Sequence, residues 1–165
     1  MAMETEAKWE GKAIAMVKGS TPNEVWPALE DFCNVHKLLP SVDVCYQLDG
    51  VYGQPGLVRY CGSAVSSLGD ETSKWCHEKL IQMDPIGRSL TYEVLENNMG
   101  IKSYSGSMKV LAIDDGDEPG CLIEWSFVAD PIDGLTSEGF LAYVEASVQA
   151  MAENIGKALR STCQS

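Results

Sequence analysis

The chain has 165 residues, of which 45% are hydrophobic and 22% charged, a composition typical of one soluble globular domain. Its 24 acidic and 12 basic residues give a net charge of −12, which argues against nucleic acids and anionic membranes as partners, because both are bound through clustered lysine and arginine. No apolar run approaches the ~20 residues that span a bilayer, and residues 1–8 (MAMETEAK) lack a signal-peptide pattern, so we expect a cytoplasmic protein without membrane insertion.

The first third of the chain predicts one strand followed by two short helices. Residues 9–18 (WEGKAIAMVK) are rich in apolar side chains and end at a glycine, which predicts a strand. Thr21 as N-cap, Pro22 at the first helical position and Glu24 three residues after the cap form a capping-box pattern, so we expect a helix here. Asn34 interrupts that helix, and one more short helical turn follows.

From residue 42 the apolar period changes to two, which predicts six further strands. Their expected ranges are 42–46, 57–61, 72–83, 89–96, 103–113 and 121–129. Turns rich in Gly, Pro, Asn and Asp separate them, and the glycine-rich turn 50–56 lacks the Gly-Lys-Ser/Thr ending of a phosphate-binding loop. No crossover helix lies between these strands, so we expect an antiparallel meander.

The last stretch, Leu135 to Cys163, predicts a long helix with one broad apolar face. Apolar residues recur there at spacings of three and four, namely Leu141, Val144, Val148, Met151, Ile155 and Leu159. At 1.5 Å rise per residue the helix is about 40 Å long, and such a helix needs a large apolar surface to lie on. We therefore predict a single α+β domain over 1–165, with about seven curved antiparallel strands wrapped around this helix and residues 1–7 disordered.

A sheet of this size around one helix rarely fills completely. Small or polar residues stand at several positions where a solid core would need bulk, namely Ser63, Ser66, Ser67, Gly106, Ser126 and Ala142. The pattern favours an internal cavity of ligand size, on the order of a few hundred Å³.

Two charged residues alternate with apolar ones in the middle of predicted strands. Arg59 shares one side of its strand with Leu57 and Cys61, and Glu78 shares one side of its strand with apolar neighbours. A charge on an inward face is costly unless it is paired, so an inward Arg59–Glu78 pair would be suited to binding an anionic oxygen and transferring a proton. The alternative is that either strand faces the other way and leaves two solvated charges.

Other polar residues carry weaker signals. Tyr92 and Tyr104 also lie mid-strand, either as further hydroxyls in the cavity or as ordinary core tyrosines. His77 adjoins Glu78 in sequence but points to the opposite face, and His36 is expected at a rim, so neither a metal site nor a catalytic triad is convincing.

Six cysteines are scattered along the chain without a C-x-x-C motif: Cys33, Cys45, Cys61, Cys76, Cys121 and Cys163. In the absence of a secretory signal we expect reduced thiols packed as small apolar groups, and no metal.

Several stretches together resemble the plant lachrymatory-factor-synthase-like proteins. They are 8–12 (KWEGK), 30–37 (EDFCNVHK), 58–60 (VRY), 75–80 (WCHEKL) and 124–127 (EWSF), and the resemblance runs in register from about residue 8 to residue 163. That family belongs to the superfamily of the birch-pollen allergen, polyketide cyclases and START-type lipid-transfer domains. The resemblance implies the helix-grip fold.

The resemblance also implies site residues and an activity. The enzyme that gives the family its name rearranges an alkenyl sulfenic acid into a thial S-oxide without metal or organic cofactor. Its essential arginine and glutamate correspond to Arg59 and Glu78, and two pocket tyrosines correspond to Tyr92 and Tyr104. We count Trp75, from the Trp-x-x-Glu-Lys-Leu motif, among the ligand-binding candidates, together with Met151, which replaces an aromatic residue.

Two functions follow as expectations. The first is a cofactor-independent isomerase acting on a small hydrophobic or sulfur-containing metabolite. The second is a protein that binds or carries a small hydrophobic ligand or plant hormone, with Arg59 holding a carboxylate. The Ser-Gly-Leu-Pro gate of abscisic-acid receptors is absent, because the corresponding loop, 63–68, reads SAVSSL in a serine-rich stretch that also departs from the synthase pattern.

Overall fold

The computed structural model describes residues 7–63, 74–113 and 119–162. Its elements in chain order are β1 (Trp9–Lys18), α1 (Pro22–Glu30), the 3₁₀ helix η1 (Phe32–Lys37), β2 (Val44–Asp49), β3 (Val58–Gly62), β4 (Trp75–Asp84), β5 (Ser89–Asn97), β6 (Tyr104–Ala112), β7 (Gly120–Ala129) and α2 (Ser137–Thr162). The expected disorder at 1–7 and the serine-rich loop 62–70 fall largely outside the described residues. Among those residues no helix combines the length and apolarity needed to cross a bilayer.

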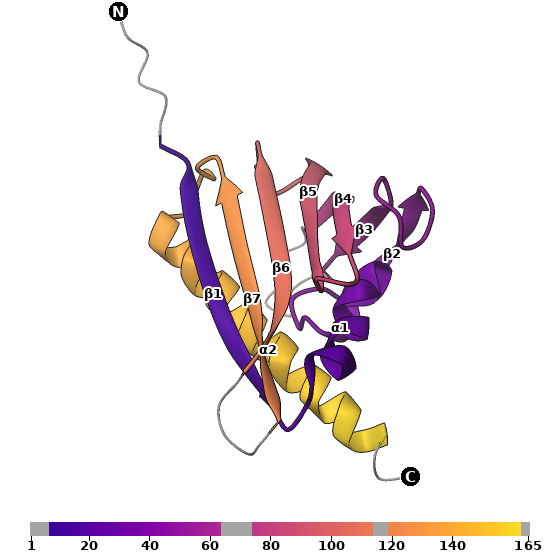
Figure 1. Cartoon of the computed structure of the whole chain (residues 1–165). Coiled ribbons are helices and arrows are strands. Elements are labelled where there is room, and N and C mark those ends of the chain that lie inside the picture. The colour runs from indigo at the N-terminus through magenta and orange to yellow at the C-terminus, as the bar shows by residue number, and fades with distance from the viewer. Residues whose placement is uncertain (1–6, 64–73, 114–118, 163–165) are drawn as a thin grey trace, which may run out of the picture.

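Within the described residues, seven strands form one antiparallel sheet in the order β1-β7-β6-β5-β4-β3-β2 (Figure 1). Strands β2 to β7 pair with their sequence neighbours, as expected for a meander, and β1 joins β7 to close the other side. The strand β7 shows the alternation that drives this arrangement, since Cys121, Ile123, Trp125, Phe127 and Ala129 are buried and the residues between them are more exposed. The predicted architecture is confirmed.

Helix α1 starts where the capping box predicts. Thr21 Oγ1 accepts a hydrogen bond from the Glu24 backbone N–H at 3.2 Å, and Glu24 Oε1 accepts one from the Thr21 N–H at 3.0 Å. The helix ends at Glu30, and Phe32 belongs to η1, in which Asn34 has non-helical backbone angles. The interruption at Asn34 is therefore present, and the first helix already ends before it, at Glu30.

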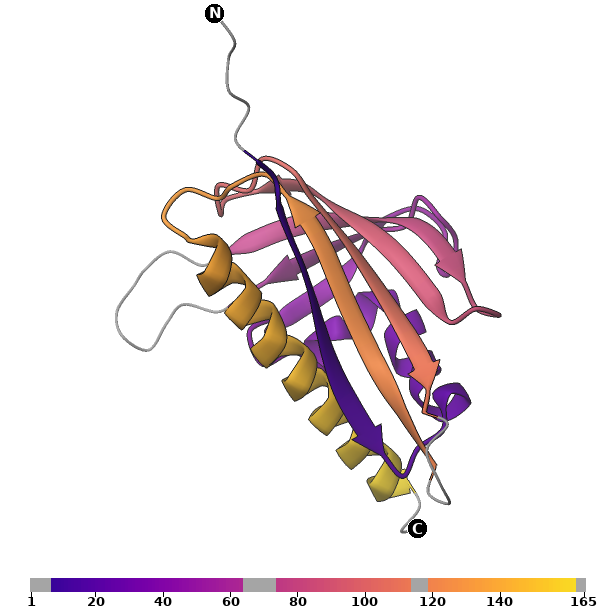
Figure 2. The same ribbon diagram turned by 60° about the vertical axis from the view of Figure 1, so that its left-hand side comes forward.

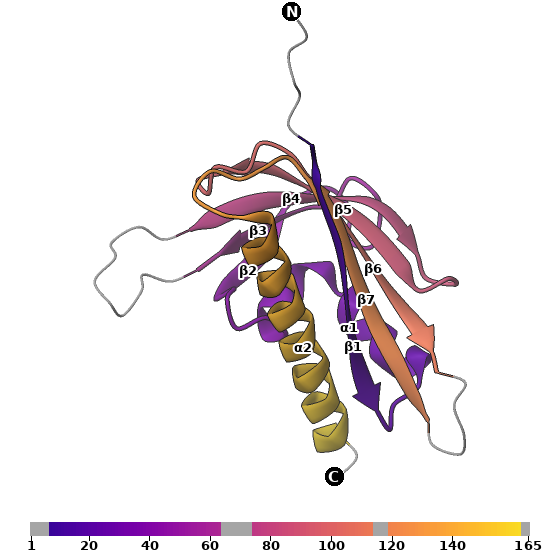
Figure 3. The same cartoon turned by 90° about the vertical axis from the view of Figure 1, so that its left-hand side faces the viewer.

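Helix α2 runs along the concave side of the sheet and packs mainly against β1 (Figures 2 and 3). Thr136 Oγ1 accepts a hydrogen bond from the Gly139 N–H at 3.0 Å and so caps the helix start. The apolar stripe is buried as predicted, with Val144, Val148, Met151 and Ile155 at most 2% exposed. In Figure 3 the sheet curves over this helix. Helix α1 packs against β6 and β7, and η1 packs against β2 and β3. These elements surround the candidate site.

Candidate functional site

Arg59 and Glu78 face each other on the inner side of the sheet. They are cross-strand partners on β3 and β4, and the guanidinium holds one carboxylate oxygen with two nitrogens. Arg59 Nε lies 2.8 Å and Nη2 lies 2.6 Å from Glu78 Oε1. The side chain of Arg59 is 6% exposed and that of Glu78 is 12% exposed. The inward orientation is thus correct, and the alternative of two solvated charges is wrong.

The 3₁₀ helix η1 fixes the other side of the guanidinium through Phe32. Arg59 Nη1 donates a hydrogen bond to the Phe32 carbonyl at 2.6 Å, and the guanidinium carbon lies 3.7 Å from the centre of the Phe32 ring. The Tyr92 ring centre is 5.4 Å away. These contacts involve three of the five N–H groups of an arginine, so the group is oriented and still has donors for an oxygen ligand.

Burial and charge act against each other on the Glu78 carboxyl group. Burial raises its pKa to about 7, and the positive charge of Arg59 limits the rise. Burial disfavours the charge of Arg59, but Glu78 together with Cys61, Tyr92 and Cys45 outweighs that effect and leaves the pKa of Arg59 raised. Arg59 is therefore a permanent cation, and Glu78 is present in both protonation states near neutral pH. Such a carboxyl group is suited to both accepting and donating a proton.

Tyr92 and Tyr104 form a polar chain with a third residue that the sequence did not indicate. Their hydroxyl oxygens are 3.0 Å apart, and the indole N–H of Trp125 donates to Tyr104 Oη at 3.1 Å. Burial raises the pKa of both tyrosines, so both hydroxyls remain protonated. The alternation of β7 places Trp125 inward, but its partner follows only from the pairing of β6 with β7.

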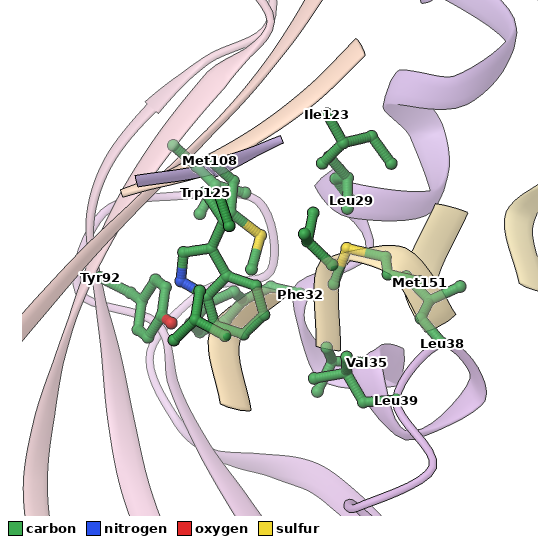
Figure 4. Close-up of a cluster of buried hydrophobic side chains, with 14 of the residues drawn as sticks. Leu29, Phe32, Val35, Leu38, Leu39, Tyr92, Met108, Ile123, Trp125 and Met151 are labelled. Atoms are coloured by element: carbon green, nitrogen blue, oxygen red, sulfur yellow. The ribbon is translucent and has the colours of Figure 1, made fainter. Parts of the chain in front are cut away.

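The cavity beside Arg59 is much smaller than predicted. Its volume is about 10 Å³, which is room for about one water molecule, and Phe32, Tyr92, Met108 and Met151 are among the residues that line it. Figure 4 shows Tyr92 and Trp125, from the sheet, facing Leu29, Val35 and Met151, from the helical elements. Met151 is placed at the cavity as predicted, but the volume of a few hundred Å³ was wrong.

The small residues on which that volume rested do not leave space. Gly106 lies opposite Tyr92 in the β5–β6 pairing, and the Tyr92 ring lies directly over it. Ser126 alternates with the buried residues of β7, and Ala142 is on the exposed side of α2. Ser66 and Ser67 lie outside the described residues.

Trp75 is not part of this cavity. It lies on the outer face of the sheet, where its ring contacts those of Tyr60 and His77 at centroid distances of 6.3 and 5.1 Å. Side chains alternate between the two faces along a strand, so Trp75 points outward because Cys76 and Glu78 on β4 point inward. The assignment of Trp75 as a ligand-binding residue of the cavity is corrected accordingly.

Three cysteines that are scattered in sequence are neighbours in the sheet. Cys45 pairs with Cys61, and Cys61 pairs with Cys76, across β2, β3 and β4. They are free thiols, as expected. Among the described residues no group of three or more His, Cys, Asp or Glu side chains has the arrangement of a metal site.

Comparison with solved structures shows the same fold at low sequence identity. XoxI from Bacillus cereus matches with a TM-score of 0.69 and 17% identity, covering 90% of this chain and 94% of that chain. Ginseng major latex-like protein 151 from Panax ginseng matches with a TM-score of 0.63 and 18% identity, covering 91% and 97%. An uncharacterized protein from Bacillus thuringiensis matches with a TM-score of 0.67 and 15% identity, covering 88% and 98%.

The sequence itself also matches one family profile over most of its length. That profile, described as polyketide cyclase/dehydrase and lipid transport, covers residues 16–160, from near the end of β1 to the last turn of α2. The matched region contains Arg59, Glu78, Tyr92, Tyr104 and Met151. The chain therefore belongs to the polyketide cyclase/dehydrase and lipid transport family.

Proposed function

We propose that the protein is a cofactor-independent isomerase of the lachrymatory-factor-synthase type, acting on a small alkenyl sulfenic acid or a related reactive metabolite. One observation carries the proposal: a buried carboxyl group with a pKa of about 7 is held against a buried guanidinium within the apolar core. This combination supplies an anion-binding group and a proton-transfer group side by side.

The rearrangement moves one proton from oxygen to carbon. Glu78 in its carboxylate form takes the proton from the sulfenic O–H, and Arg59 stabilises the resulting oxygen charge. The protonated Glu78 then returns the proton to the double-bonded carbon further from sulfur, which gives the thial S-oxide and restores the carboxylate. Among the described residues, Glu78 Oε2 has no hydrogen-bond partner, because the contacts of Arg59 and Cys61 go to Oε1, so Oε2 is the oxygen suited to this transfer.

The surroundings favour a small substrate. The cavity of about 10 Å³ must enlarge before anything but water enters, and the flexible Met151 side chain is the lining residue best suited to move. A substrate of a few heavy atoms needs only such an adjustment, whereas a steroid-sized ligand would require the helices to separate from the sheet. Tyr92 and Tyr104, as protonated donors, would orient the substrate in a site poor in water.

The lipid-transport part of the family description favours a second candidate function, the binding or transport of a small hydrophobic ligand. In that case Arg59 would hold a carboxylate of the ligand, and Glu78 would only position Arg59. The two functions differ in whether Glu78 is needed for chemistry.

A coupled assay distinguishes them. An alliinase generates the alkenyl sulfenic acid in place, and the thial S-oxide is measured for wild type, Arg59→Leu and Glu78→Gln. We expect product from wild type and a loss of about 10²-fold or more in either variant. Glu93→Gln is the matched control, because Glu93 is an exposed glutamate on the adjacent strand β5, and it should retain full activity. No product from folded wild type, or full turnover by Glu78→Gln, would overturn the isomerase proposal.

A further inference from the structure

Cys45, Cys61 and Cys76, which we call the thiol row, lie side by side on three adjacent strands next to the Arg59–Glu78 pair. Cys45 Sγ is 3.7 Å from Cys61 Sγ, and Cys61 Sγ is 3.6 Å from Glu78 Oε1. Nothing in the isomerisation uses these sulfur atoms, and a row of thiols beside a buried ion pair is more than small apolar packing requires.

The backbone geometry brings two members of the row into disulfide range. Ser63 and Leu57 direct their backbone groups to β4, and Cys61, two residues before Ser63 and four after Leu57, therefore does the same. Cys61 and Cys45 then form a pair without mutual backbone hydrogen bonds, the arrangement in which Cα atoms approach to about 4.5 Å. A disulfide accepts that separation without movement of the strands.

The surroundings also separate the roles of the thiols. S–H groups of Cys45 and Cys76 that point at Cys61 lower its pKa, and the positive charge of Arg59 acts in the same direction. The pKa of Cys45 and Cys76 is raised by their hydrogen bonds to Cys61 and by burial. Cys61 is thus the member of the row whose thiol loses its proton most readily. Cys45 is half-buried on β2, an edge strand of the sheet, so a small molecule can reach the row from that side.

We propose that Cys61 and Cys45 form a peroxide-reactive dithiol site, with a small hydroperoxide as its co-reactant. The Cys61 sulfur attacks the outer peroxide oxygen, the O–O bond breaks, and the leaving alkoxide or hydroxide takes the proton held by Glu78. Cys61 is then a sulfenic acid. The Cys45 thiol attacks that sulfur, its proton leaves with the hydroxyl group as water, and a Cys45–Cys61 disulfide results. In total, two thiols lose two electrons to the peroxide, and an external dithiol restores them.

Arg59 and Glu78 have defined parts in this chemistry. The guanidinium stabilises the negative charge on the departing oxygen, and the carboxyl group supplies its proton. The site does not depend on the isomerase activity, since it needs only the thiols and the ion pair.

Trypsin separates the members of the thiol row, which makes the test direct. Cleavage after Lys37, Arg59, Lys74 and Lys79 places Cys45 in peptide 38–59, Cys61 in peptide 60–74 and Cys76 in peptide 75–79. The reduced, folded protein is treated with hydrogen peroxide, blocked with N-ethylmaleimide, digested without reductant and analysed by mass spectrometry. We expect peptides 38–59 and 60–74 to appear joined, about 2 Da lighter than their sum.

Two variants and an unfolded sample keep the result interpretable. Cys45→Ala should stop Cys61 at the sulfenic acid, which dimedone traps, and Cys121→Ser, at a buried thiol on β7, should leave the link unchanged. The link should form roughly ten-fold or more faster in the folded protein than in urea. Equal rates in both states, a link of peptide 60–74 to 75–79 instead, or oxidation of Cys121 ahead of Cys61 would overturn the proposal.

Discussion

The ionisation of Glu78 links the chemistry of the site to the stability of the fold. Its pKa is raised by burial from 4.5 to about 7 despite the opposing charge of Arg59, so the folded state holds the proton more tightly than the unfolded chain. The stabilisation that comes with this proton is fully present below pH 4.5 and is lost as pH rises through about 7. Above this pH Glu78 is a carboxylate that can act as a base, and it then stabilises the fold least.

Glu78→Gln tests this link, because an amide of the same shape does not titrate. We expect the free energy of unfolding of wild type, relative to Glu78→Gln, to fall as pH rises from 4.5 to 7, on the order of 3 kcal/mol in total. Urea unfolding of both proteins across this range measures the difference. The free energy of unfolding of the control Glu93→Gln should follow that of wild type across this pH range. If the free energies of unfolding of wild type and Glu78→Gln differed by the same amount at every pH, the raised pKa of Glu78 would be contradicted.

Gly106 is the residue on which the Tyr92 ring rests. A Cβ at this position would lie 2.6 Å from Tyr92 Cζ and 2.7 Å from its oxygen, so the ring would have to move and its hydrogen bond to Tyr104 would be strained. We expect Gly106→Ala to cost about 1–3 kcal/mol of stability and to lower turnover. Thermal unfolding and the coupled assay measure both effects.

Gly120 supplies the matched control for that substitution. It is also a strand glycine, on β7, but the nearest atom to an added Cβ would be Ile113 Cδ1 at 3.5 Å, an ordinary contact. Gly120→Ala should therefore unfold within about 0.5 kcal/mol of wild type. If both variants lost the same stability, the contact of Tyr92 with Gly106 would not be the cause.

At the scale of elements, the sequence predicts what is periodic and local. The capping box at Thr21 marks the start of α1, and alternation puts Arg59 and Glu78 on the same side of β3 and β4 as apolar residues. Spacing alone left open whether that side faces inward, and the burial of the ion pair decides it. The pairing of Cys45 with Cys61 and of Trp125 with Tyr104 depends on register between strands, which no local pattern encodes.

Side-chain packing was the other feature beyond the reach of the sequence. The predicted cavity assumed that small residues leave space, whereas the Tyr92 ring covers Gly106 and helix α2 brings Met151 against Phe32 and Tyr92. Whether a neighbour fills a gap is a property of the three-dimensional arrangement, and interiors are packed as densely as organic crystals. The elements were therefore predictable, and the volume between them was not.

Met151 on α2 allows that volume to be changed by one substitution. It is fully buried and lines the small cavity, so Met151→Ala should cost about 2–5 kcal/mol of stability and open space beside Arg59. Small apolar ligands should then raise the melting temperature of the variant more than that of wild type. Met16→Ala is the control, because Met16 is 47% exposed and should change stability by less than about 0.5 kcal/mol. Equal ligand effects in all three proteins would show that Met151 does not limit the cavity.

At the scale of the whole molecule, the two edges of the sheet differ in how firmly they are held. The edge strand β1 packs against α2 along its inner side, and its buried residues alternate regularly. The other edge strand, β2, has five exposed residues out of six, and its register with β3 shifts between Gln47 and Asp49. The adjoining η1 contains the non-helical Asn34. The exposed side chains of β2, its irregular pairing and the non-helical Asn34 make the β2–η1 end the weaker part of the fold.

This difference predicts where the closed site opens. A substrate cannot enter a cavity of about 10 Å³ without local motion, and the β2–η1 end lies beside Arg59, since the carbonyl of Phe32 in η1 binds the guanidinium. We expect the amides of β2 and η1 to exchange hydrogen roughly ten-fold or more faster than those of β7 and central α2, measured by mass spectrometry under native conditions. Protection of β2 and η1 equal to that of β7 would mean that the site opens only when the whole domain unfolds, and rapid entry of a substrate by local motion would then be excluded.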